Sequence, residues 1–488
     1  MNHFIFIFSI ITINLFLVNA NTTVIIIGAG AAGIAAASLL AEHGISFVIL
    51  EAEDRIGGRI FSTYFGESKV DLGAQWSHGE QNNTMYNLIK DLDLVKPSDF
   101  KKNLYYSAEN FDKSFASDLY WLCKKIFLKE KPVEEMSVGS FIEKRFRERV
   151  EEKYGNDEKI SKYVNEILIT FMHDILVQRG ALSWFDVSML NDYDRLKGQA
   201  YLDWKGCGHG IILDVMMKRY PNLSEELPIA ENIIFNKQVN KIRWDGPPSV
   251  QCTDGSEYFT SHIILTASLG VLKHNYRSLF HPVLPQSKID AINSLGIASV
   301  FKVVLEFSNR WWDPQSFKTA ALCWDTADLK LLHDEFPKGR MKNNQSWLEN
   351  LCEFHALDKN PNMLVAWFTG EFVPDIELLP DSTIIEGIMH VLVKFFGRQY
   401  KVTKPVGLLR NNWNSNQHFR GVYSYETVES RKLNESAALI LSKPLISRDG
   451  NLSLLFAGEA TSPTHYATVH GAIESGYQEA QRIIQLSL

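Results

Sequence analysis

Cysteine is scarce in this chain, and no two cysteines are spaced as a metal-binding or redox pair. The 488 residues contain five cysteines, and none of them belongs to a Cys-x-x-Cys motif. The sequence therefore indicates no metal site. Because five is an odd number, at least one thiol is unpaired within the chain, and we expect most of the cysteines to be buried core residues.

The chain also lacks an excess of positive charge, internal repeats and low-complexity segments. It has 50 lysine and arginine residues against 57 aspartate and glutamate residues, for a formal net charge of −7. This balance argues against a nucleic-acid partner. With 45% hydrophobic residues, a chain of this length can bury large cores and should divide into two domains.

An apolar stretch at the start of the chain, Phe4 to Val18, predicts export. It is short for a membrane span and is followed by a small-residue cleavage pattern ending at Ala20, although it lacks the usual basic residues in front. We expect residues 1–20 to be a signal peptide and the protein to be secreted, without stable membrane insertion; a retained anchor is the alternative. Six glycosylation sequons agree with this route: Asn21, Asn82, Asn222, Asn344, Asn434 and Asn451.

A glycine-rich turn between a strand and a helix predicts a dinucleotide site. The apolar run Val24 to Ile27 is typical of a buried parallel strand, and Gly28, Gly30 and Gly33 follow it in a GxGxxG pattern. The first glycine permits a tight turn, the second lets the backbone approach a pyrophosphate, and the third lets the helix lie close to its strand. The first N–H groups of that helix can bind the anion.

The next strand supports the same interpretation, because Phe47 to Leu50 ends at Glu51, where a carboxylate can accept both ribose hydroxyls. A strand, a glycine turn and a helix recur near the end, at Leu454 to Ala457, Gly458-Glu459 and Val469 to about Leu486. The nucleotide-binding part is therefore expected to be discontinuous. Between these ends the pattern predicts helices within 110–149 and 154–180, a β-meander over Ile233–Trp244, Ser249–Thr253 and Tyr258–Thr266, strands at Val300–Phe307 and Met363–Thr369, and a helix at Ile384–Phe396.

Several motifs in the same order resemble those of the flavin amine oxidases, and most closely the animal polyamine and spermine oxidases. They are the tail EAEDRIGGR with Gly58 and Arg59, VDLGAQWSHG from Val70, LTASLGVLK from Leu265, WNSNQHFRGVYSYE from Trp413 and the closing segment from Leu454. Without the other motifs, the basic segment EAEDRIGGR could be a solvated loop. The resemblance implies an α/β fold with a Rossmann-like, discontinuous FAD-binding domain (21–100, 206–290 and 408–488) and an α+β substrate-binding domain with a mixed sheet (101–205 and 291–407).

The resemblance also implies the chemistry. Such an enzyme moves a hydride from the carbon beside an amine to FAD, water hydrolyses the imine, and oxygen reoxidises the flavin to give hydrogen peroxide. The resemblance also implies that covalent attachment of the flavin would use a cysteine thiol late in the chain. No cysteine follows Cys352, so we expect FAD to be bound noncovalently. The positions that match the family's FAD contacts are Gly28, Gly30, Ala31, Gly33, Glu51, Gly58, Arg59, Gln75, Trp76, Val239, Trp413, Gly458, Glu459, Thr468 and Val469.

Two residues match catalytic positions of the family. Lys302, in FKVVLEF, matches a lysine that holds a water against the flavin, and its apolar neighbours predict a lowered pKa. A lysine in such a strand can also simply be solvated. His78, in QWSHGE, matches a histidine that assists amine deprotonation; a histidine that only caps the turn before Gly79 is the alternative.

Substrate contacts are expected from Tyr423, Thr468, Trp76 and Asp203. Tyr423 matches one of two aromatic rings that flank an amine in many relatives, whereas Thr468 replaces the second ring, which disfavours a monoamine oxidase. Asp203, in YLDW, is preferred to Glu80, Asp192 and Asp194 as the partner of a remote ammonium group.

Two alternatives stay open. An L-amino-acid oxidase of the same fold would need an arginine for the substrate carboxylate, and Arg179 or Arg410 could supply it. A secreted flavin-binding protein that has lost catalysis is the other alternative, and Lys302 and His78 argue against it.

Overall fold

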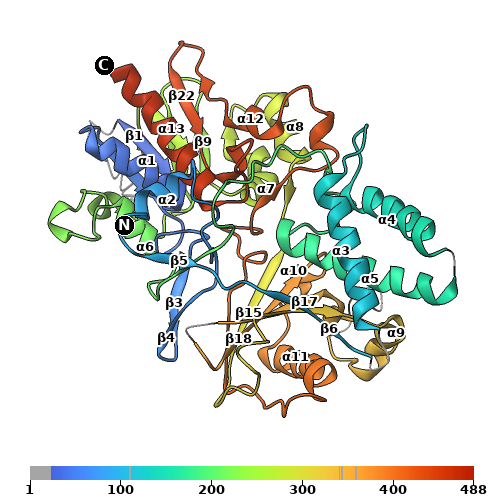
Figure 1. The fold of residues 1–488 in the computed structure, drawn as a ribbon. Helices are drawn as coiled ribbons and strands as arrows, with labels where there is room; N and C mark the ends of the chain where they lie inside the picture. The colour runs from blue at the N-terminus through green and yellow to red at the C-terminus, as the bar shows by residue number, and fades with distance from the viewer. Residues whose placement is uncertain are drawn as a thin grey trace, which may run out of the picture.

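The computed structural model describes residues 23–108, 112–155, 157–339, 341, 345–357 and 360–487 and combines several sheets with surrounding helices (Figure 1). The expected signal peptide and the sequons at Asn21 and Asn344 lie outside these ranges. Within them, no helix is long and apolar enough to cross a membrane. All five cysteines are described, four of them are buried, and none is in a disulfide.

The first sheet has six strands in the order β21-β22-β12-β1-β2-β8. All neighbours from β22 to β8 run parallel, and only β21 is antiparallel. The predicted strands at Val24–Ile27 and Phe47–Leu50 are confirmed as β1 and β2, side by side at its centre. The other members are β8 (Ile233–Ile234), β12 (His262–Leu265), β21 (Leu445–Ile446) and β22 (Leu452–Phe456).

Both faces of this sheet are covered, as alternate side chains of β1 show. Val24 and Ile26 belong to one core cluster, with α1 (Ala31–Glu42) and α13 (Val469–Ser487), whereas the other two β1 side chains belong to a second. Helix α1 lies so close to β1 that a Cβ on Gly33 would be 2.0 Å from the Gly28 carbonyl oxygen. The opposite face carries β9 (Val239–Arg243), β10 (Ser249–Cys252), β11 (Glu257–Phe259), α7 (Leu269–Leu279), α8 (Gln286–Ser294) and α12 (Ala437–Ser442).

The expected β-meander is right only in its middle. Strands β9, β10 and β11 pair antiparallel in a separate sheet, but the two ends of the segment, β8 and β12, pair in parallel with β2 and β1. Their apolar side chains are the reason: Ile263 and Ile264 are fully buried, one in each of the two core clusters of the first sheet. A pattern of alternating residues cannot by itself show which sheet a strand joins.

A second six-stranded sheet has the order β19-β15-β18-β17-β16-β6 and is mostly antiparallel. The predicted strands at 300–307 and 363–369 are β15 (Val300–Glu306) and β18 (Met363–Thr369), its neighbouring members. Strand β19 (Gly407–Arg410) pairs with β15, although residues from 408 onward were expected with the nucleotide-binding part. The remaining strands are β6 (Lys102–Tyr106), β16 (Thr319–Cys323) and β17 (Leu351–Ala356).

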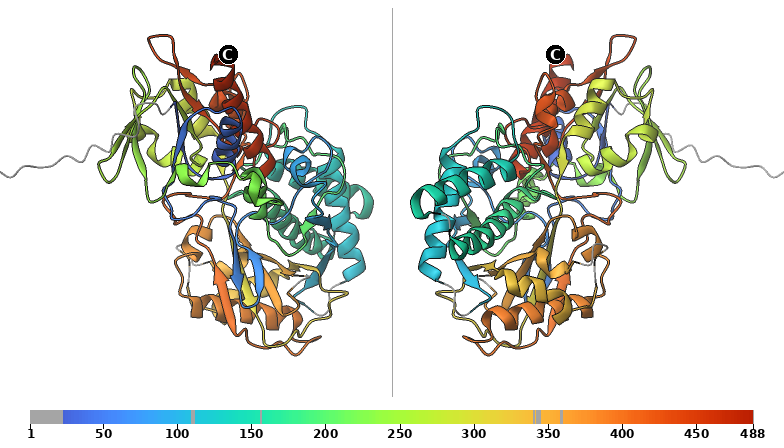
Figure 2. Two further views of the ribbon diagram at one scale, coloured as in Figure 1. Left: turned by 90° about the vertical axis from the view of Figure 1, so that its left-hand side faces the viewer. Right: turned by 90° about the vertical axis from the view of Figure 1, so that its right-hand side faces the viewer.

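The two faces of this second large sheet have different neighbours. Phe301, Val303 and Leu305 of β15 pack with α11 (Asp381–Phe396), the helix predicted at 384–396. Lys302 lies on the other face, which α5 (Glu158–Arg179) contacts through β16, β17 and β18. Helices α3 (Lys113–Lys129) and α4 (Val138–Tyr154) pack on α5, and Figure 2 shows this helical group beside the sheet and below the first sheet.

Shorter elements connect these parts. They are β3 (Ser62–Phe65), β4 (Ser68–Asp71), β5 (Val95–Pro97), β7 (Leu202–Trp204), β13 (Phe280–His281), β14 (Gly296–Ile297), β20 (Ser424–Tyr425), α2 (Thr84–Ile89), α6 (Ile211–Met216), α9 (Thr326–Glu335) and α10 (Val373–Ile376).

Candidate active site

A cavity of about 700 Å³ extends from the carboxyl edge of the first sheet to the face of the second large sheet that carries Lys302. Segments far apart in the sequence line it. Of the predicted site residues, the following line this cavity: Gly28, Gly30, Ala31, Glu51, Gly58, Arg59, Gln75, Trp76, His78, Val239, Lys302, Trp413, Tyr423, Gly458, Glu459, Thr468 and Val469. Gly33 and Asp203 lie outside it.

The first-sheet end of the cavity is shaped to accept a dinucleotide. Gly28 has φ +105, and a Cβ there would lie 2.6 Å from Thr266 Oγ1, so the turn has no room for a side chain. Helix α1 begins at Ala31 with no side-chain cap, which leaves N–H groups at its N-terminus for an anion. The Glu51 carboxylate is buried at the tip of β2 and accepts from the Ala29 N–H at 2.6 Å and the Glu53 N–H at 2.8 Å.

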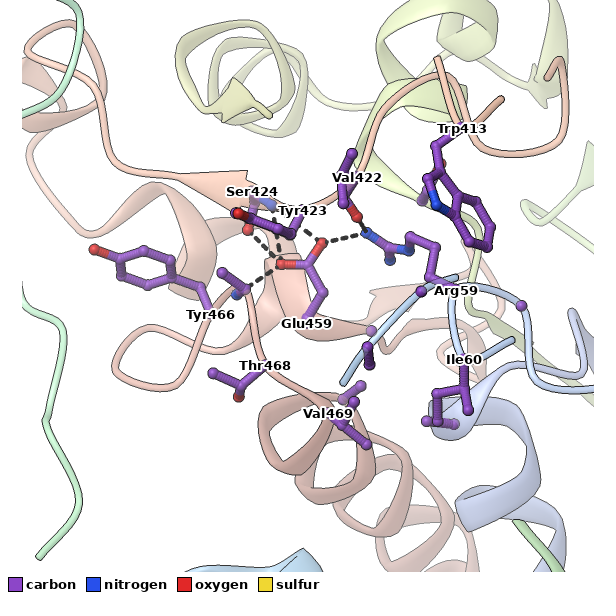
Figure 3. Close-up of a pocket in the computed structure, with 18 of the residues that line it drawn as sticks. Arg59, Ile60, Trp413, Val422, Tyr423, Ser424, Glu459, Tyr466, Thr468 and Val469 are labelled. Atoms are coloured by element: carbon purple, nitrogen blue, oxygen red, sulfur yellow. Dashed lines mark hydrogen bonds and ion pairs between the residues drawn. The ribbon is translucent and has the colours of Figure 1, made fainter. Parts of the chain in front are cut away.

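Arg59 and Glu459 form an ion pair beside this cradle (Figure 3). Arg59 Nη1 donates to Glu459 Oε1 at 2.8 Å and to the Val422 carbonyl at 2.5 Å. Glu459 Oε2 accepts from the Ser424 hydroxyl at 2.6 Å and the Ala467 N–H at 2.9 Å. The pair therefore fastens the EAEDRIGGR tail to the closing segment, and the basic tail is not a solvated loop.

Thr468 and Tyr423 line the same part of the cavity (Figure 3). The Thr468 hydroxyl accepts from the Gly471 N–H at 3.0 Å and donates to the His465 carbonyl at 2.6 Å, so it fixes the start of α13. The Tyr423 hydroxyl lies 3.4 Å from the Val177 carbonyl. Tyr423 therefore presents an aromatic ring to the cavity, whereas both hydrogen-bonding functions of Thr468 are used within the chain.

Lys302 is buried on its strand and is held by neutral acceptors. Its Nζ donates to the carbonyls of Asp71 and Gly73, both at 2.7 Å, and lies 3.3 Å from Gln75 Oε1. Burial lowers the pKa of this ammonium to about 8, and the Asp71 carboxylate offsets only part of that effect. Lys302 is thus positioned in the cavity with a pKa that suits proton transfer near neutral pH.

His78 is held in one tautomer. Its Nδ1 lies 3.0 Å from the Ala200 carbonyl, and because a carbonyl can only accept, Nδ1 carries the proton and Nε2 is the basic nitrogen. Burial lowers the pKa of His78. The ring also meets Tyr201 edge to face, with centroids 5.2 Å apart. A neutral imidazole of this kind can accept a proton from an ammonium group.

Aromatic rings line the cavity beside Lys302. Trp76 stacks on Trp367 with centroids 5.9 Å apart and meets Tyr201 edge to face at 5.6 Å. Trp367 also lies under the Lys302 ammonium, with Nζ 5.1 Å from the ring centroid. Trp413 belongs to another part of the lining and donates its N–H to the Leu72 carbonyl at 3.2 Å.

Comparison with known proteins assigns the chain to a family. The sequence model described as flavin containing amine oxidoreductase matches residues 31–484, nearly the whole chain. The chain belongs to the flavin-containing amine oxidoreductase family. It is 28% identical to the peroxisomal N(1)-acetyl-spermine/spermidine oxidase of Homo sapiens, over 95% of each chain. It is 26% identical to probable polyamine oxidase 5 of Arabidopsis thaliana, over 95% of this chain and 98% of that one, and 28% identical to polyamine oxidase 1 of Oryza sativa subsp. japonica, over 95% and 97%.

Membership of the flavin-containing family implies an FAD cofactor, and the cavity fits one. The uncapped start of α1 and the glycine turn suit the pyrophosphate, Glu51 suits a ribose, and Lys302 lies further along the same cavity. Val239 on β9 lines the first-sheet end, as a residue beside the adenine would.

Asp203 is not where a substrate carboxylate was expected. Leu202 and Trp204, its neighbours on β7, are buried, and the alternation of the strand turns Asp203 to the opposite, half-buried side. Glu80, Asp192 and Asp194 also lie outside the cavity lining. The acids that do line it away from the nucleotide end are Asp174 and Glu353, which the sequence analysis missed.

These two acids belong to a buried ionic cluster. Lys102 Nζ lies 2.6 Å from Asp174 Oδ1 and 2.7 Å from Glu353 Oε2, and His355 Nε2 lies 2.6 Å from Glu353 Oε1. A signal for Glu353 and His355 exists in the sequence: they occupy alternate positions of an apolar strand and so share a face. No such pattern in the sequence singles out Asp174, because helix α5 contains many other charged residues among which Asp174 does not stand out.

The two arginines considered for a substrate carboxylate differ in position. Arg410 donates to Asp381 Oδ1 and the Glu377 carbonyl, both at 2.7 Å, outside the cavity. Arg179 lines the cavity, over the Tyr193 ring at 5.3 Å, and among the described residues its Nε has no hydrogen-bond partner.

Proposed function

We propose that this protein is a secreted, FAD-dependent polyamine oxidase that cleaves a C–N bond of spermine, spermidine or their acetylated forms. The observation that carries the proposal is one cavity that joins a dinucleotide cradle, the buried Lys302 and a pair of buried carboxylates. The names of several relatives, which include acetylspermine/spermidine and polyamine oxidases, support the choice of substrate. The proposal includes the division into a discontinuous FAD-binding domain and a substrate-binding domain.

In the proposed mechanism the residues around the cavity bind the amine and move its protons. FAD, when bound, supplies the hydride acceptor and is reoxidised by oxygen. His78 accepts the proton of the reacting ammonium through Nε2, since hydride loss requires a neutral amine. Lys302, with its pKa near 8, exchanges a proton with an ordered water at its Nζ.

The aromatic part of the lining suits a cationic chain. Trp76, Trp367 and Tyr423 present aromatic rings, whose faces attract ammonium groups. Asp174 and Glu353 add two negative charges beyond the rings, and the Lys102 ammonium between them offsets one of these. Among the described residues that line the cavity there is no cysteine, which supports noncovalent binding of FAD.

Secretion is supported by the surface positions of the described sequons. Asn82, Asn222, Asn434 and Asn451 are all exposed, as glycan attachment requires. Expression of the full chain in animal cells should place the protein in the medium, with a mass that falls after glycosidase treatment. Retention in the cell without glycans would contradict secretion and leave the catalytic proposal intact.

The catalytic proposal is tested by anaerobic mixing with amines. Spermine or N1-acetylspermine should bleach the flavin, and oxygen should then restore the colour with one hydrogen peroxide per amine oxidised. A purified protein that binds FAD but is bleached by no polyamine would overturn the assignment.

An L-amino-acid oxidase is the second candidate, and Arg179 is the observation that favours it. Leucine should then bleach the flavin, and Arg179→Met should raise KM for leucine while leaving any reaction with spermine unchanged. Bleaching by spermine alone excludes this candidate.

The FAD-binding role of Glu51 has a separate test. Glu51→Ala should lower the fraction of protein that retains FAD, because a carboxylate to the ribose is lost, while turnover per bound flavin stays the same. Absorbance at the flavin and protein bands measures the first quantity, and peroxide release divided by flavin measures the second. A fall in turnover per flavin with full FAD content would contradict this role.

A further inference from the structure

The face of the second large sheet that forms the cavity wall carries two lysines. The strand register places Lys302 opposite Trp367, and Trp367 opposite Glu353. Neighbouring strands lie about 4.8 Å apart, so Glu353 is on the order of 10 Å from Lys302 along the sheet. On the next strands of the sheet, His355 of β17 lies opposite Thr319 of β16, and Thr319 lies opposite Lys102 of β6.

The Lys102 ammonium lies between two carboxylates as a ligand would. Its Nζ contacts Asp174 and Glu353 at 2.6 and 2.7 Å, and the three side chains are only 14%, 5% and 2% exposed. Other groups of the chain support the two acids: the Tyr120 hydroxyl at 3.0 Å and the Gln178 amide at 3.0 Å donate to Asp174 Oδ2, and His355 contacts Glu353. The carboxylates therefore form a preorganised ammonium site that is already filled.

This site forms part of the wall of the cavity. Lys102, Asp174, Gln178, Glu353 and His355 all line it, and the sheet register places Trp367 between Lys302 and Glu353. An extended amine that reacts near Lys302 would direct its remote end toward these residues. Lys102, Asp174 and Glu353 together have a net charge of −1, which attracts a cation. The position between the two carboxylates, where a substrate ammonium would bind most closely, is however occupied by the Lys102 ammonium.

We infer that Lys102 is a specificity-determining residue that occupies the remote-ammonium position of the cavity, so that an amine with an uncharged, acylated remote end is accepted as well as one with a free ammonium. The inference rests on the proposed polyamine oxidase function and names its substrate class. Replacing Lys102 would open the position, and a free terminal ammonium could then bind both acids.

The test uses variants that keep the buried charge balanced. Lys102→Met alone leaves two adjacent carboxylates and can fail to fold, so the main variant is Lys102→Met with Asp174→Asn, which keeps the net charge of −1 and leaves Glu353 free. Adding Glu353→Gln removes the ammonium site and is the matched control. Lys124→Met, which removes another lysine from the lining, controls for the loss of one positive charge.

The first readout is the ratio of kcat/KM for spermine to that for N1-acetylspermine. The double variant should raise this ratio about tenfold or more, because a charge-assisted hydrogen bond is gained by the free ammonium alone. The triple variant and Lys124→Met should leave the ratio within about threefold of the starting protein. An unchanged ratio in a folded, FAD-loaded double variant would overturn the inference.

The second readout needs no turnover. Calorimetry with n-butylammonium should detect binding to the double variant at concentrations where the unsubstituted protein and the triple variant bind none. If no protein oxidises polyamines but this pattern holds, the proposed function fails and the assignment of the ammonium position stands. If polyamines are oxidised and the double variant binds no n-butylammonium, the inference alone is wrong.

Discussion

Lys302 and Lys102 lie on the same sheet face and line the same cavity, yet their surroundings give them opposite properties. Lys302 contacts backbone carbonyls and an amide, and burial lowers its pKa to about 8. Burial also acts on Lys102, but the attraction of Glu353 and Asp174 outweighs it and raises the pKa well above the usual lysine value. The comparison shows that partner charge, rather than burial, decides whether a buried lysine can exchange a proton or serves as a fixed cation.

The largest expected effect is on stability, at the Lys102 end. Lys102→Met should lower the free energy of unfolding by about 3 kcal/mol at neutral pH, because it leaves Asp174 and Glu353 buried together without a counter-charge. Urea unfolding of the FAD-loaded protein measures this. Lys102→Met with Asp174→Asn should recover most of the loss, and equal destabilisation by both variants would contradict a charge effect.

At acid pH, the difference in free energy of unfolding between the unsubstituted protein and Lys102→Met should become smaller. Although burial raises the pKa of Glu353, Lys102 and His355 lower it to about 2. The stability that Glu353 contributes is present above its unfolded pKa of about 4.3 and is lost as the pH falls toward 2. In Lys102→Met, protonation of Asp174 and Glu353 removes the repulsion between their buried negative charges. The difference in free energy of unfolding between the two proteins should therefore become smaller below about pH 4. A difference in free energy of unfolding that becomes larger in acid would contradict an ionic interaction between Lys102 and the two acids.

The next effect is on catalysis, at the Lys302 end. Lys302→Met should slow flavin reduction or reoxidation on the order of a hundredfold, because a positioned proton-transfer group is lost. Stopped-flow absorbance of the flavin measures each half-reaction. The FAD content should not change, because the carbonyls of Asp71 and Gly73 are main-chain groups. Equal losses of FAD and rate would make Lys302 a structural residue.

The smallest effect is a pH dependence. If Lys302 titrates near pH 8, reoxidation of chemically reduced flavin should change by up to about tenfold across that pH, and Lys302→Met should flatten the profile. Working without amine keeps the titration of the substrate out of the measurement. Lys102→Met with Asp174→Asn should keep the inflection. A profile that is unchanged in Lys302→Met would assign the inflection to another group.

Much of the first sheet was predictable, because its signals are local. The apolar run before Gly28 and the strand before Glu51 predicted β1 and β2 correctly, and the late strand and helix were also correct. The strands at Ile233 and His262 were recognised, but their sheet was not. Pairing between distant strands depends on how the cores close over both faces, and a single strand carries no record of its partner.

The sequence by itself determined the dinucleotide cradle, because glycine at close backbone approaches and a carboxylate at a strand tip are requirements of neighbouring residues. Lys302 was indicated by the resemblance to the flavin amine oxidases; its apolar neighbours favoured burial, and the structure buries it. Only the tertiary structure decided which acids line the cavity beyond the nucleotide end. Asp203 turns away through the alternation of a strand, whereas Asp174, Glu353 and Lys102 come from three separate segments and meet only when α5 packs on the sheet. Charges that balance one another across such distances leave no pattern along the chain.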